Sequence, residues 1–128
     1  MASEREVIVA PGAPAALGPY SHAVASGGLL FCSGQIPLHP DTGDLVGVSA
    51  AAQARRCFEN LRAVCEAAGT SLERALRITI YMVELGGFAE VNDVCGEVFP
   101  IDPPARATLG VAALPRGALV EIDAIVAL

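Results

Sequence analysis

The residue whose type and setting best suggest chemistry is Arg106. In the strand that it is predicted to begin, alternation places Thr108 and Gly110 on the same face as Arg106. The other face of this strand is apolar and is expected to be core: Ala107, Leu109 and Val111. A planar guanidinium matches a carboxylate with two parallel hydrogen bonds. The pattern alone favours an ordinary ion pair of Arg106 with Glu121 or Asp123, and the alternative is a site that holds a small molecule's carboxylate.

Charge and composition limit the chemistry that is available. All eight basic residues are arginines, and fourteen acidic residues give a net charge of −6. The absence of lysine excludes a lysine Schiff base, and the negative charge disfavours a nucleic-acid partner, because nucleic-acid affinity depends on clustered positive charge. The cysteines form no Cys-x-x-Cys pair: Cys32, Cys57, Cys65 and Cys95. With only two histidines to accompany them, we expect structural thiols and no bound metal.

The composition predicts a single folded domain over residues 1–128. Hydrophobic residues make up 53% of the chain and charged residues 17%, which argues against disorder and suggests apolar surface buried against other copies. The apolar run Ala118–Leu128 contains two acidic residues and is shorter than the ~20 residues of a membrane span. Met1–Val9 carries charges and no apolar signal core. We therefore expect a cytoplasmic protein without a membrane segment.

The first third of the chain predicts loops and a hairpin. Ala10–Pro19 is rich in proline and glycine, which indicates an ordered loop. His22–Ala25 and Leu29–Ser33 are short extended runs that flank Ser26-Gly27-Gly28, as the strands of a β-hairpin do. Pro37–Gly47 is expected to be a turn-rich surface loop.

Helices and strands alternate in the remainder. Ser49–Ala68 repeats apolar residues at helical spacing, with Ser49 as its cap and Gly69 after its end. Leu76–Val83 alternates as a strand. Phe88–Phe99 is expected to be a second helix. Its inward residues are expected to be Phe88, Val91, Cys95, Val98 and Phe99.

Two strands, Arg106–Ala112 and Ala118–Ala127, are expected to close the fold around a turn near Leu114–Gly117. On the last strand, Glu121 and Asp123 face away from an apolar side made of Val120, Ile122 and Ala124. The predicted order is β-β-(β)-α-β-α-β-β, with the strand in parentheses optional. Helices between strands predict an α/β (α+β) fold, a mixed sheet with both helices on one face. A second copy of the chain is an economical cover for the other face.

Six segments follow one another from Gly18 to Ala124. They are Gly18-Pro19-Tyr20-Ser21, Ser33-Gly34-Gln35-Ile36-Pro37, Ala51-Ala52-Gln53-Ala54-Arg55 with Asn60-Leu61, Phe88-Ala89-Glu90-Val91-Asn92, Pro104-Ala105-Arg106 and Val120-Glu121-Ile122-Asp123-Ala124. Together they resemble the Rid/YjgF family, the reactive-intermediate (enamine/imine) deaminases. Each segment alone is a weak signal, but the six in order are specific. The resemblance favours a functional Arg106 over an ordinary ion pair.

The resemblance implies a chorismate-mutase-like fold and a homotrimer with three clefts between subunits. It also implies an enzyme, a hydrolase of the 2-iminobutanoate/2-iminopropanoate deaminase kind. Such an enzyme converts 2-imino acids, formed from enamines such as 2-aminoacrylate, to 2-keto acids and ammonia. No metal or organic cofactor is implied. The expected partner is a small imino or keto acid, and neither nucleic acid nor a membrane is expected.

The resemblance assigns roles to four residues. Arg106 would hold the substrate carboxylate, and Glu121 would orient or activate the attacking water. Gly34 has no side chain, so its backbone could approach the substrate closely. Tyr20 would form an aromatic wall and offer one hydroxyl. Arg106 and Glu121 are therefore the expected catalytic residues, and Tyr20 and Gly34 are expected to bind substrate.

Four further polar residues have open or structural roles. Ser33 could donate a hydrogen bond to the substrate or cap a strand. Asn92 could contact the substrate or tie the second helix to a loop. His22 is expected at the surface or an interface, and Asp123 is expected to be structural or solvent-facing.

Thr108 departs from the family pattern, which has a cysteine two residues after the site arginine. Threonine keeps a hydrogen-bonding group but cannot form a thiolate. Thr108 remains an expected substrate-binding residue, while the preferred imine side chain and the pathway stay open. The alternatives are a non-catalytic or regulatory module that binds a small carboxylate in the same cleft, and a ribonuclease, which the charge opposes.

Overall fold

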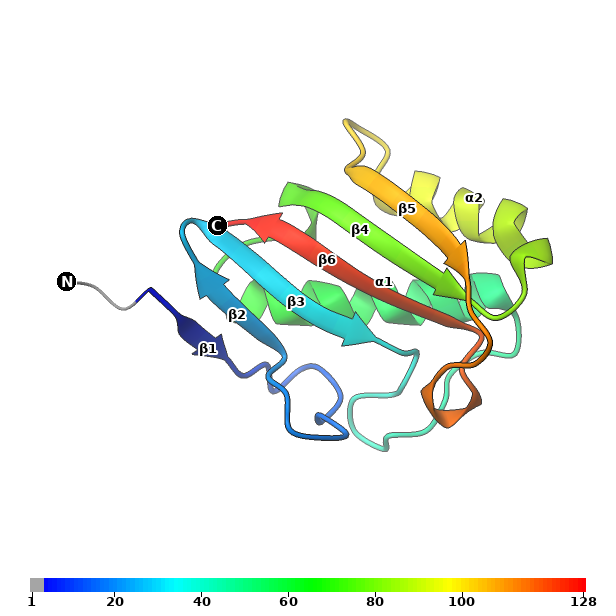
Figure 1. The fold of residues 1–128 in the computed structure, drawn as a ribbon, viewed down its shortest axis with the longest axis horizontal. Helices are drawn as coiled ribbons and strands as arrows, with labels where there is room; N and C mark the ends of the chain where they lie inside the picture. Colours follow the sequence, from blue (N-terminus) through cyan, green and yellow to red (C-terminus); the bar gives the residue numbers. More distant parts are fainter. Residues whose placement is uncertain (1–3) are drawn as a thin grey trace.

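The computed structural model describes residues 4–128, so Met1–Ser3 of the charged N-terminal segment lie outside the described residues. The chain forms one six-stranded sheet with two helices against it (Figure 1). The strands are β1 (Glu6–Ile8), β2 (Ala23–Ser26), β3 (Leu29–Gln35), β4 (Ala75–Met82), β5 (Ala105–Gly110) and β6 (Val120–Ala127). The helices are α1 (Ala50–Ala67) and α2 (Phe88–Val98), with short 3₁₀ turns at Leu72–Arg74, Leu85–Gly87 and Pro115–Gly117. The predicted mixed α/β fold is confirmed.

The strands lie in the order β1-β2-β3-β6-β4-β5. β4 and β5 are parallel, with α2 in the connection between them, and the other neighbouring pairs are antiparallel. The predicted hairpin is confirmed: β2 and β3 are joined through Gly27 and Gly28, whose φ angles of 60° and 79° lie in the left-handed region that glycine favours. The prediction missed β1. With three residues, of which only Ile8 is buried, this strand is too short to produce an alternating pattern.

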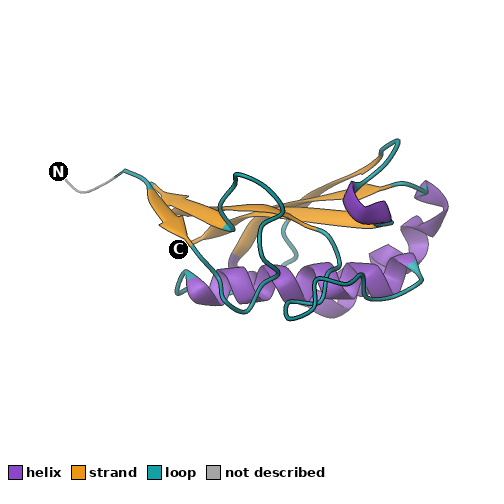
Figure 2. Cartoon of the chain, turned by 90° about the horizontal axis from the view of Figure 1, so that it is seen from below, coloured by secondary structure: helices purple, strands orange, loops and turns teal. Residues whose placement is uncertain are grey.

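Both helices lie on the same side of the sheet (Figure 2). α1 begins as predicted, because the Ser49 side chain accepts a hydrogen bond from the backbone nitrogen of Ala52 at 3.1 Å. It ends before Gly69, whose φ is 81°. A second hydrogen bond from the first turn of α1 goes to α2: the backbone nitrogen of Ala51 donates to the Glu90 carboxylate at 2.9 Å. An acidic side chain of the second helix thus stabilises the N-terminus of the first.

Two parts of the predicted core are wrong. Ala107 and Leu109 of β5, which were expected to be core, face the open side of the sheet, and Leu109 is 40% exposed; Val111, the third residue of that set, follows the end of the strand. The reason is that β5 is an edge strand whose other face, with Arg106 and Thr108, lies toward α2. On α2 itself Phe88 is 43% exposed, whereas Val94, which was not predicted, is completely buried.

Two buried amides on α1 hold the loops at one end of the sheet. The side-chain oxygen of Gln53 accepts a hydrogen bond from the backbone nitrogen of Leu119 at 2.7 Å. The side-chain nitrogen of Asn60 donates to the carbonyl oxygens of Ile36 and Leu38 at 3.3 and 3.0 Å. A buried amide is unfavourable unless it is bonded, so these contacts fix where the loops after β3 and before β6 run.

The expectation of a surface or interface histidine at position 22 is wrong, because His22 is buried within the chain. Its Nδ1 accepts a hydrogen bond from the backbone nitrogen of Ala10 at 2.9 Å, and its Nε2 lies 2.8 Å from the carbonyl oxygen of Pro14. These two contacts engage both ring nitrogens of His22. His22 thereby anchors the predicted loop Ala10–Pro19, which leads to Tyr20.

Candidate functional site

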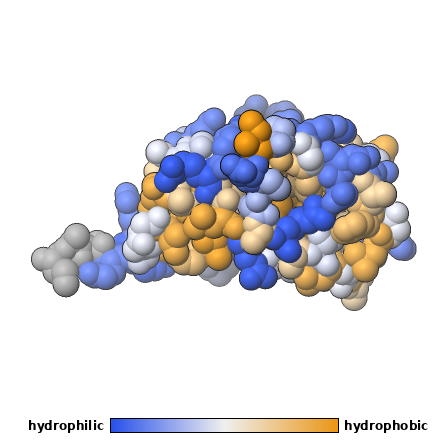
Figure 3. Space-filling model, turned by 90° about the horizontal axis from the view of Figure 1, so that it is seen from above, coloured by the Kyte–Doolittle hydropathy of each residue, from blue (hydrophilic) through white to orange (hydrophobic). Residues whose placement is uncertain are grey.

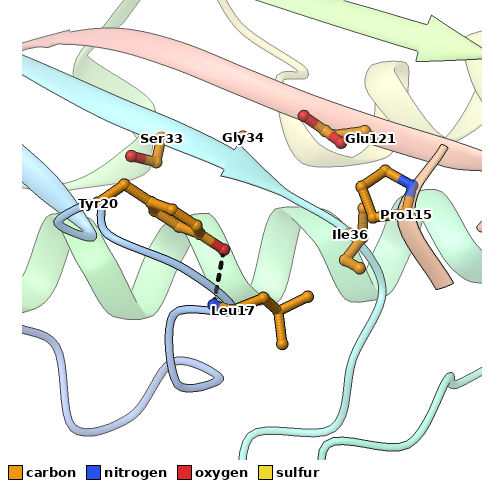
Figure 4. A pocket seen from close by; sticks show the side chains of 7 residues that line it. All are labelled: Leu17, Tyr20, Ser33, Gly34, Ile36, Pro115 and Glu121. Carbon is orange, nitrogen blue, oxygen red and sulfur yellow. Dashed lines mark hydrogen bonds between the residues drawn. The ribbon is translucent and has the colours of Figure 1, made fainter.

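A pocket of about 290 Å³ opens where β3 and β6 meet the loops (Figure 4). We call it the Glu121 pocket; it is lined by Leu17, Tyr20, Ser33, Gly34, Ile36, Pro115 and Glu121. The regular pairing of β3 with β6 is interrupted between Cys32 and Gln35. This irregularity lies at Ser33 and Gly34 and bends the strand edge away from β6. Four residues predicted for the site are therefore neighbours in the folded chain.

Gly34 and Glu121 fit together so closely that a side chain at position 34 would have to displace the Glu121 carboxylate. A Cβ there would overlap the Glu121 carboxylate, whose Cδ would lie only 2.9 Å away. The predicted reason for this glycine was close approach of substrate to its backbone. The structure shows that, in the isolated chain, the carboxylate of Glu121 occupies this space.

Tyr20 and Ser33 differ in what they can offer a ligand. The Tyr20 hydroxyl accepts a hydrogen bond from the backbone nitrogen of Leu17 at 3.0 Å, which leaves its own proton available (Figure 4). The Ser33 hydroxyl instead donates its proton to the carbonyl oxygen of Ser21 at 2.6 Å. Of the two roles left open for Ser33, the geometry favours the strand tie.

The Glu121 carboxyl has a raised pKa. Burial is the larger cause, and the negative charge of Asp123, two residues along the same face of β6, adds to it. Asp123 is itself held by Tyr81 on β4, whose hydroxyl donates to Asp123 Oδ2 at 2.9 Å. This hydrogen bond to the carboxylate raises the pKa of Tyr81. Asp123 thus has the structural role that was expected, and it favours the protonated form of Glu121.

Arg106 lies in a different cluster, against α2. One of its terminal nitrogens donates to Asn92 Oδ1 at 2.7 Å, and its guanidinium carbon lies 5.5 Å from the centre of the Phe88 ring. Among the described residues no carboxylate forms an ion pair with Arg106. Asn92 therefore positions the arginine, and the other nitrogens of the exposed guanidinium can bind an anion.

The proposed ion pair of Arg106 with Glu121 or Asp123 is not formed, because the groups face opposite sides of the sheet. Arg106 is in parallel register with Ile78, which is buried beneath the helices. Glu121 and Asp123 alternate on β6 with buried residues and so face the open side. The strand β4 lies between β5 and β6. One copy of the chain therefore cannot bring Arg106 and Glu121 to the same small molecule.

The side chain of Thr108 is a buried hydroxyl whose hydrogen bonds are not satisfied within residues 4–128. It lies two residues after Arg106 on the same face of β5, and its Oγ1 is buried with no hydrogen-bond partner among the described residues. A buried hydroxyl without a partner destabilises a protein by ~1–3 kcal/mol. Among the described residues, this hydroxyl therefore lacks the hydrogen bond that a buried polar group needs.

Sequence reasoning missed several residues of both clusters. Leu17, Ile36 and Pro115 supply apolar wall to the Glu121 pocket, and Phe88 lies beside the Arg106 guanidinium. Leu17, Ile36 and Phe88 lie in or beside the segments that carry the family resemblance. For an apolar residue in a loop, however, no sequence pattern distinguishes a pocket wall from the core. Phe88 was mistaken for a core residue because it fits the helical repeat.

Residues 4–128 contain neither a metal-binding cluster nor a membrane-spanning helix. Within that range there is no group of three or more His, Cys, Asp or Glu that could hold a metal ion. All four cysteines are buried and free of disulfides. None of the helices described is long and apolar enough to cross a membrane.

A family model described as "Endoribonuclease L-PSP" matches residues 11–128. Protein DfrA of Myxococcus xanthus is 51% identical over 123 residues, which cover 94% of this chain and 94% of that protein. The chain belongs to the Rid/YjgF family. A 2-iminobutanoate/2-iminopropanoate deaminase of Dermatophagoides farinae is 39% identical over 124 residues, covering 97% of each protein. The crystal structure of RidA from the Antarctic bacterium Psychrobacter sp. PAMC 21119 matches with a TM-score of 0.92 at 41% identity, covering 96% of this chain and 99% of that one.

We expect Thr108→Val to stabilise the protein by ~1 kcal/mol, because a methyl group replaces a buried hydroxyl that has no partner. Urea unfolding at one fixed protein concentration measures this. Thr70→Val is the matched control: the Thr70 hydroxyl donates to the carbonyl oxygen of Ala127 at 2.6 Å, so its loss should destabilise by a similar amount. A Thr108→Val variant as unstable as the control would show that Thr108 is already bonded.

We expect Glu121→Gln to stabilise the protein at neutral pH and not in acid. Because the folded-state pKa is raised, ionising Glu121 is less favourable in the folded chain than in the unfolded one. The resulting destabilisation is absent below the ordinary pKa of ~4.3 and complete above the raised folded pKa. Melting temperatures at pH 7 and at pH 4 measure the difference, with the exposed Glu66→Gln as control. An equal effect at both pH values would contradict this account of Glu121.

Proposed function

We propose that this protein hydrolyses 2-imino acids, and the enamines that tautomerise to them, to 2-keto acids and ammonia. The observation that carries the proposal is an arginine whose guanidinium is held in position and is free to bind a carboxylate. Arg106 is positioned by Asn92 and Phe88, is exposed, and has no acidic partner among residues 4–128. The name of the Dermatophagoides farinae relative supports the same reaction class.

The proposed chemistry needs few groups. One water adds to the imine carbon and one ammonia leaves, which gives the keto acid without any change of oxidation state. Holding the carboxylate on Arg106 fixes the imine carbon relative to the water, and such positioning can supply much of the rate. Glu121 takes a proton from the attacking water, and its raised pKa makes it a stronger base. The free proton of Tyr20 can stabilise the departing or attacking group.

The proposed site requires two copies of the chain, because Arg106 and Glu121 face opposite sides of one sheet. In the homotrimer that we propose, one subunit contributes Arg106 with Thr108 and the next contributes Glu121 with the rest of its pocket. The open face of the sheet is suited to such an interface: Phe31 is 44% exposed and Leu109 is 40% exposed there. Apolar surface of this kind is typical of subunit contacts.

We expect Arg106→Ala to lower kcat/KM by roughly 100-fold or more, because each charge-assisted hydrogen bond to a carboxylate contributes ~1.5–3 kcal/mol. Arg106→Lys should recover only part of the loss, since an ammonium lacks the planar fork. Keto-acid release is measured from imines that an amino-acid oxidase generates in the assay. Arg74→Ala, which removes an arginine bonded near the C-terminus, is the matched control. If Arg106→Ala accelerates imine hydrolysis as much as the wild-type protein does, the role assigned to Arg106 is overturned.

We expect the inactive variants Arg106→Ala and Glu121→Gln to restore activity when their subunits are mixed. After denaturation and refolding together, about a quarter of the sites should be intact, because each contributing subunit carries its essential residue half of the time. Each variant refolded alone is the control. No recovery, with mixed oligomers shown by mass spectrometry, would place both residues in one subunit's site.

The same assays separate catalysis from binding alone. Saturable binding of 2-ketobutyrate, lost in Arg106→Ala, together with no effect on the hydrolysis of any imine, would indicate a regulatory carboxylate-binding module. The endoribonuclease in the family model's description is opposed by the net charge of −6 and the absence of lysine.

A further inference from the structure

A second pocket, of about 200 Å³, is lined in part by Arg106 and otherwise by residues that the reaction described above does not use. It is formed where α2, the loop that follows it and the first residues of β5 meet. Its lining consists of Ile78, Cys95, Phe99, Pro103, Pro104 and Arg106, and we call it the Cys95 pocket. α2 and β5 lie along the upper edge of the molecule in Figure 1, and Figure 3, which views that edge, shows apolar patches between polar ones.

Apart from the Arg106 guanidinium, the Cys95 pocket has an uncharged lining. Ile78 and Phe99 are almost completely buried in the core below it. Burial raises the pKa of the Cys95 thiol more than the neighbouring Arg106 lowers it, so the thiol is neutral at physiological pH. A ligand that fits here must therefore present an apolar group to the pocket and an anion to Arg106.

The walls of the Cys95 pocket are held in place before any ligand arrives. The Phe99 ring packs edge-on against Phe58 of α1, with ring centres 5.6 Å apart and planes at 82°. Pro103 and Pro104 restrict the backbone on the opposite wall. A preformed apolar pocket loses little conformational entropy on binding, so burying a side chain in it adds to affinity.

We propose that the Cys95 pocket receives the side chain of the substrate whose carboxylate is bound by Arg106. This inference rests on the proposed function and adds the substrate class: 2-imino acids with branched aliphatic or aromatic side chains. An apolar cavity of ~150 Å³ is large enough to bind benzene, so a pocket of this size accepts an isobutyl or a phenyl group. In the imine of alanine, a single methyl group would leave most of the pocket empty.

Binding of stable keto acids tests the pocket without relying on catalysis. Calorimetry of the wild-type protein compares pyruvate, 2-ketobutyrate, 4-methyl-2-ketopentanoate and phenylpyruvate. We expect affinity to rise roughly fourfold for each methylene that is buried. The six-carbon branched acid should therefore bind at least roughly tenfold more tightly than pyruvate. Equal affinities across the series would overturn the proposal.

A variant that fills the pocket tests the same inference through selectivity. Cys95→Leu should lower kcat/KM for the imine of leucine roughly tenfold more than for the imine of alanine, because the added carbons occupy the side chain's place. Cys95→Ala, which enlarges the pocket, should raise kcat/KM for the imine of phenylalanine relative to kcat/KM for the imine of alanine. Ala67→Leu adds the same aliphatic group to an exposed position of α1 and should leave the ratio unchanged.

The outcomes distinguish a failed pocket from a failed function. If the protein accelerates the hydrolysis of every imine and neither Cys95 variant changes the ratios of kcat/KM between imines, the pocket is rejected and the proposed function is left intact. Tighter binding of the branched keto acid without acceleration of any imine would reject the function and support the pocket. Should Cys95→Leu fail to fold, the keto-acid series on the wild-type protein and the Cys95→Ala ratio decide the question.

Discussion

Arg106 and Glu121 belong to one sheet but face opposite sides of it, and this constraint governs the rest of the site. β4 separates their strands, and the alternation of side chains along a strand cannot be changed without exposing the core of β6. A small molecule that needs both groups must therefore lie between two copies of the chain. The exposed apolar residues of the open face and the arginine at the edge strand β5 are consistent with that arrangement.

Four polar side chains of this protein hold other groups in position through their hydrogen bonds. Asn92 holds Arg106, Ser33 ties β3 to the segment before β2, and Gln53 and Asn60 anchor the loops beside the Glu121 pocket. Several of these polar residues lie in segments that resemble the family, where they could be mistaken for substrate contacts. Their geometry shows that Ser33, Gln53 and Asn60 fix the backbone and that Asn92 holds the Arg106 side chain.

The sequence predicted the elements with strong periodicity and misjudged the faces of weaker ones. α1 was predictable because its stripe of apolar residues, its Ser49 cap and its terminal glycine agree. β1 was missed because three residues carry no pattern, and the two faces of β5 were misassigned because an apolar face was equated with core although the strand lies at an edge. The motifs brought together Tyr20, Ser33, Gly34 and Glu121, which line one pocket, but not its apolar walls. That Arg106 lies apart from them depends on strand order, which a single sequence does not encode locally.

The groups with unmet bonding capacity mark the site independently of any resemblance. Ionised Glu121 is disfavoured by burial, Arg106 lacks a carboxylate, and the Thr108 hydroxyl lacks any partner in the described part of the chain. The ionised Glu121 and the unpaired Thr108 hydroxyl each reduce a total stability that is only ~5–15 kcal/mol in a typical domain, so such groups are tolerated where binding satisfies them. Thr108 is the clearest example of such a group. A buried, unpaired hydroxyl is less favourable than the thiol of the family pattern, since a thiol bonds weakly and loses less on leaving water. Thr108 shares its face of β5 with Arg106, two residues away, so this unfavourable group lies next to the arginine proposed to hold the carboxylate.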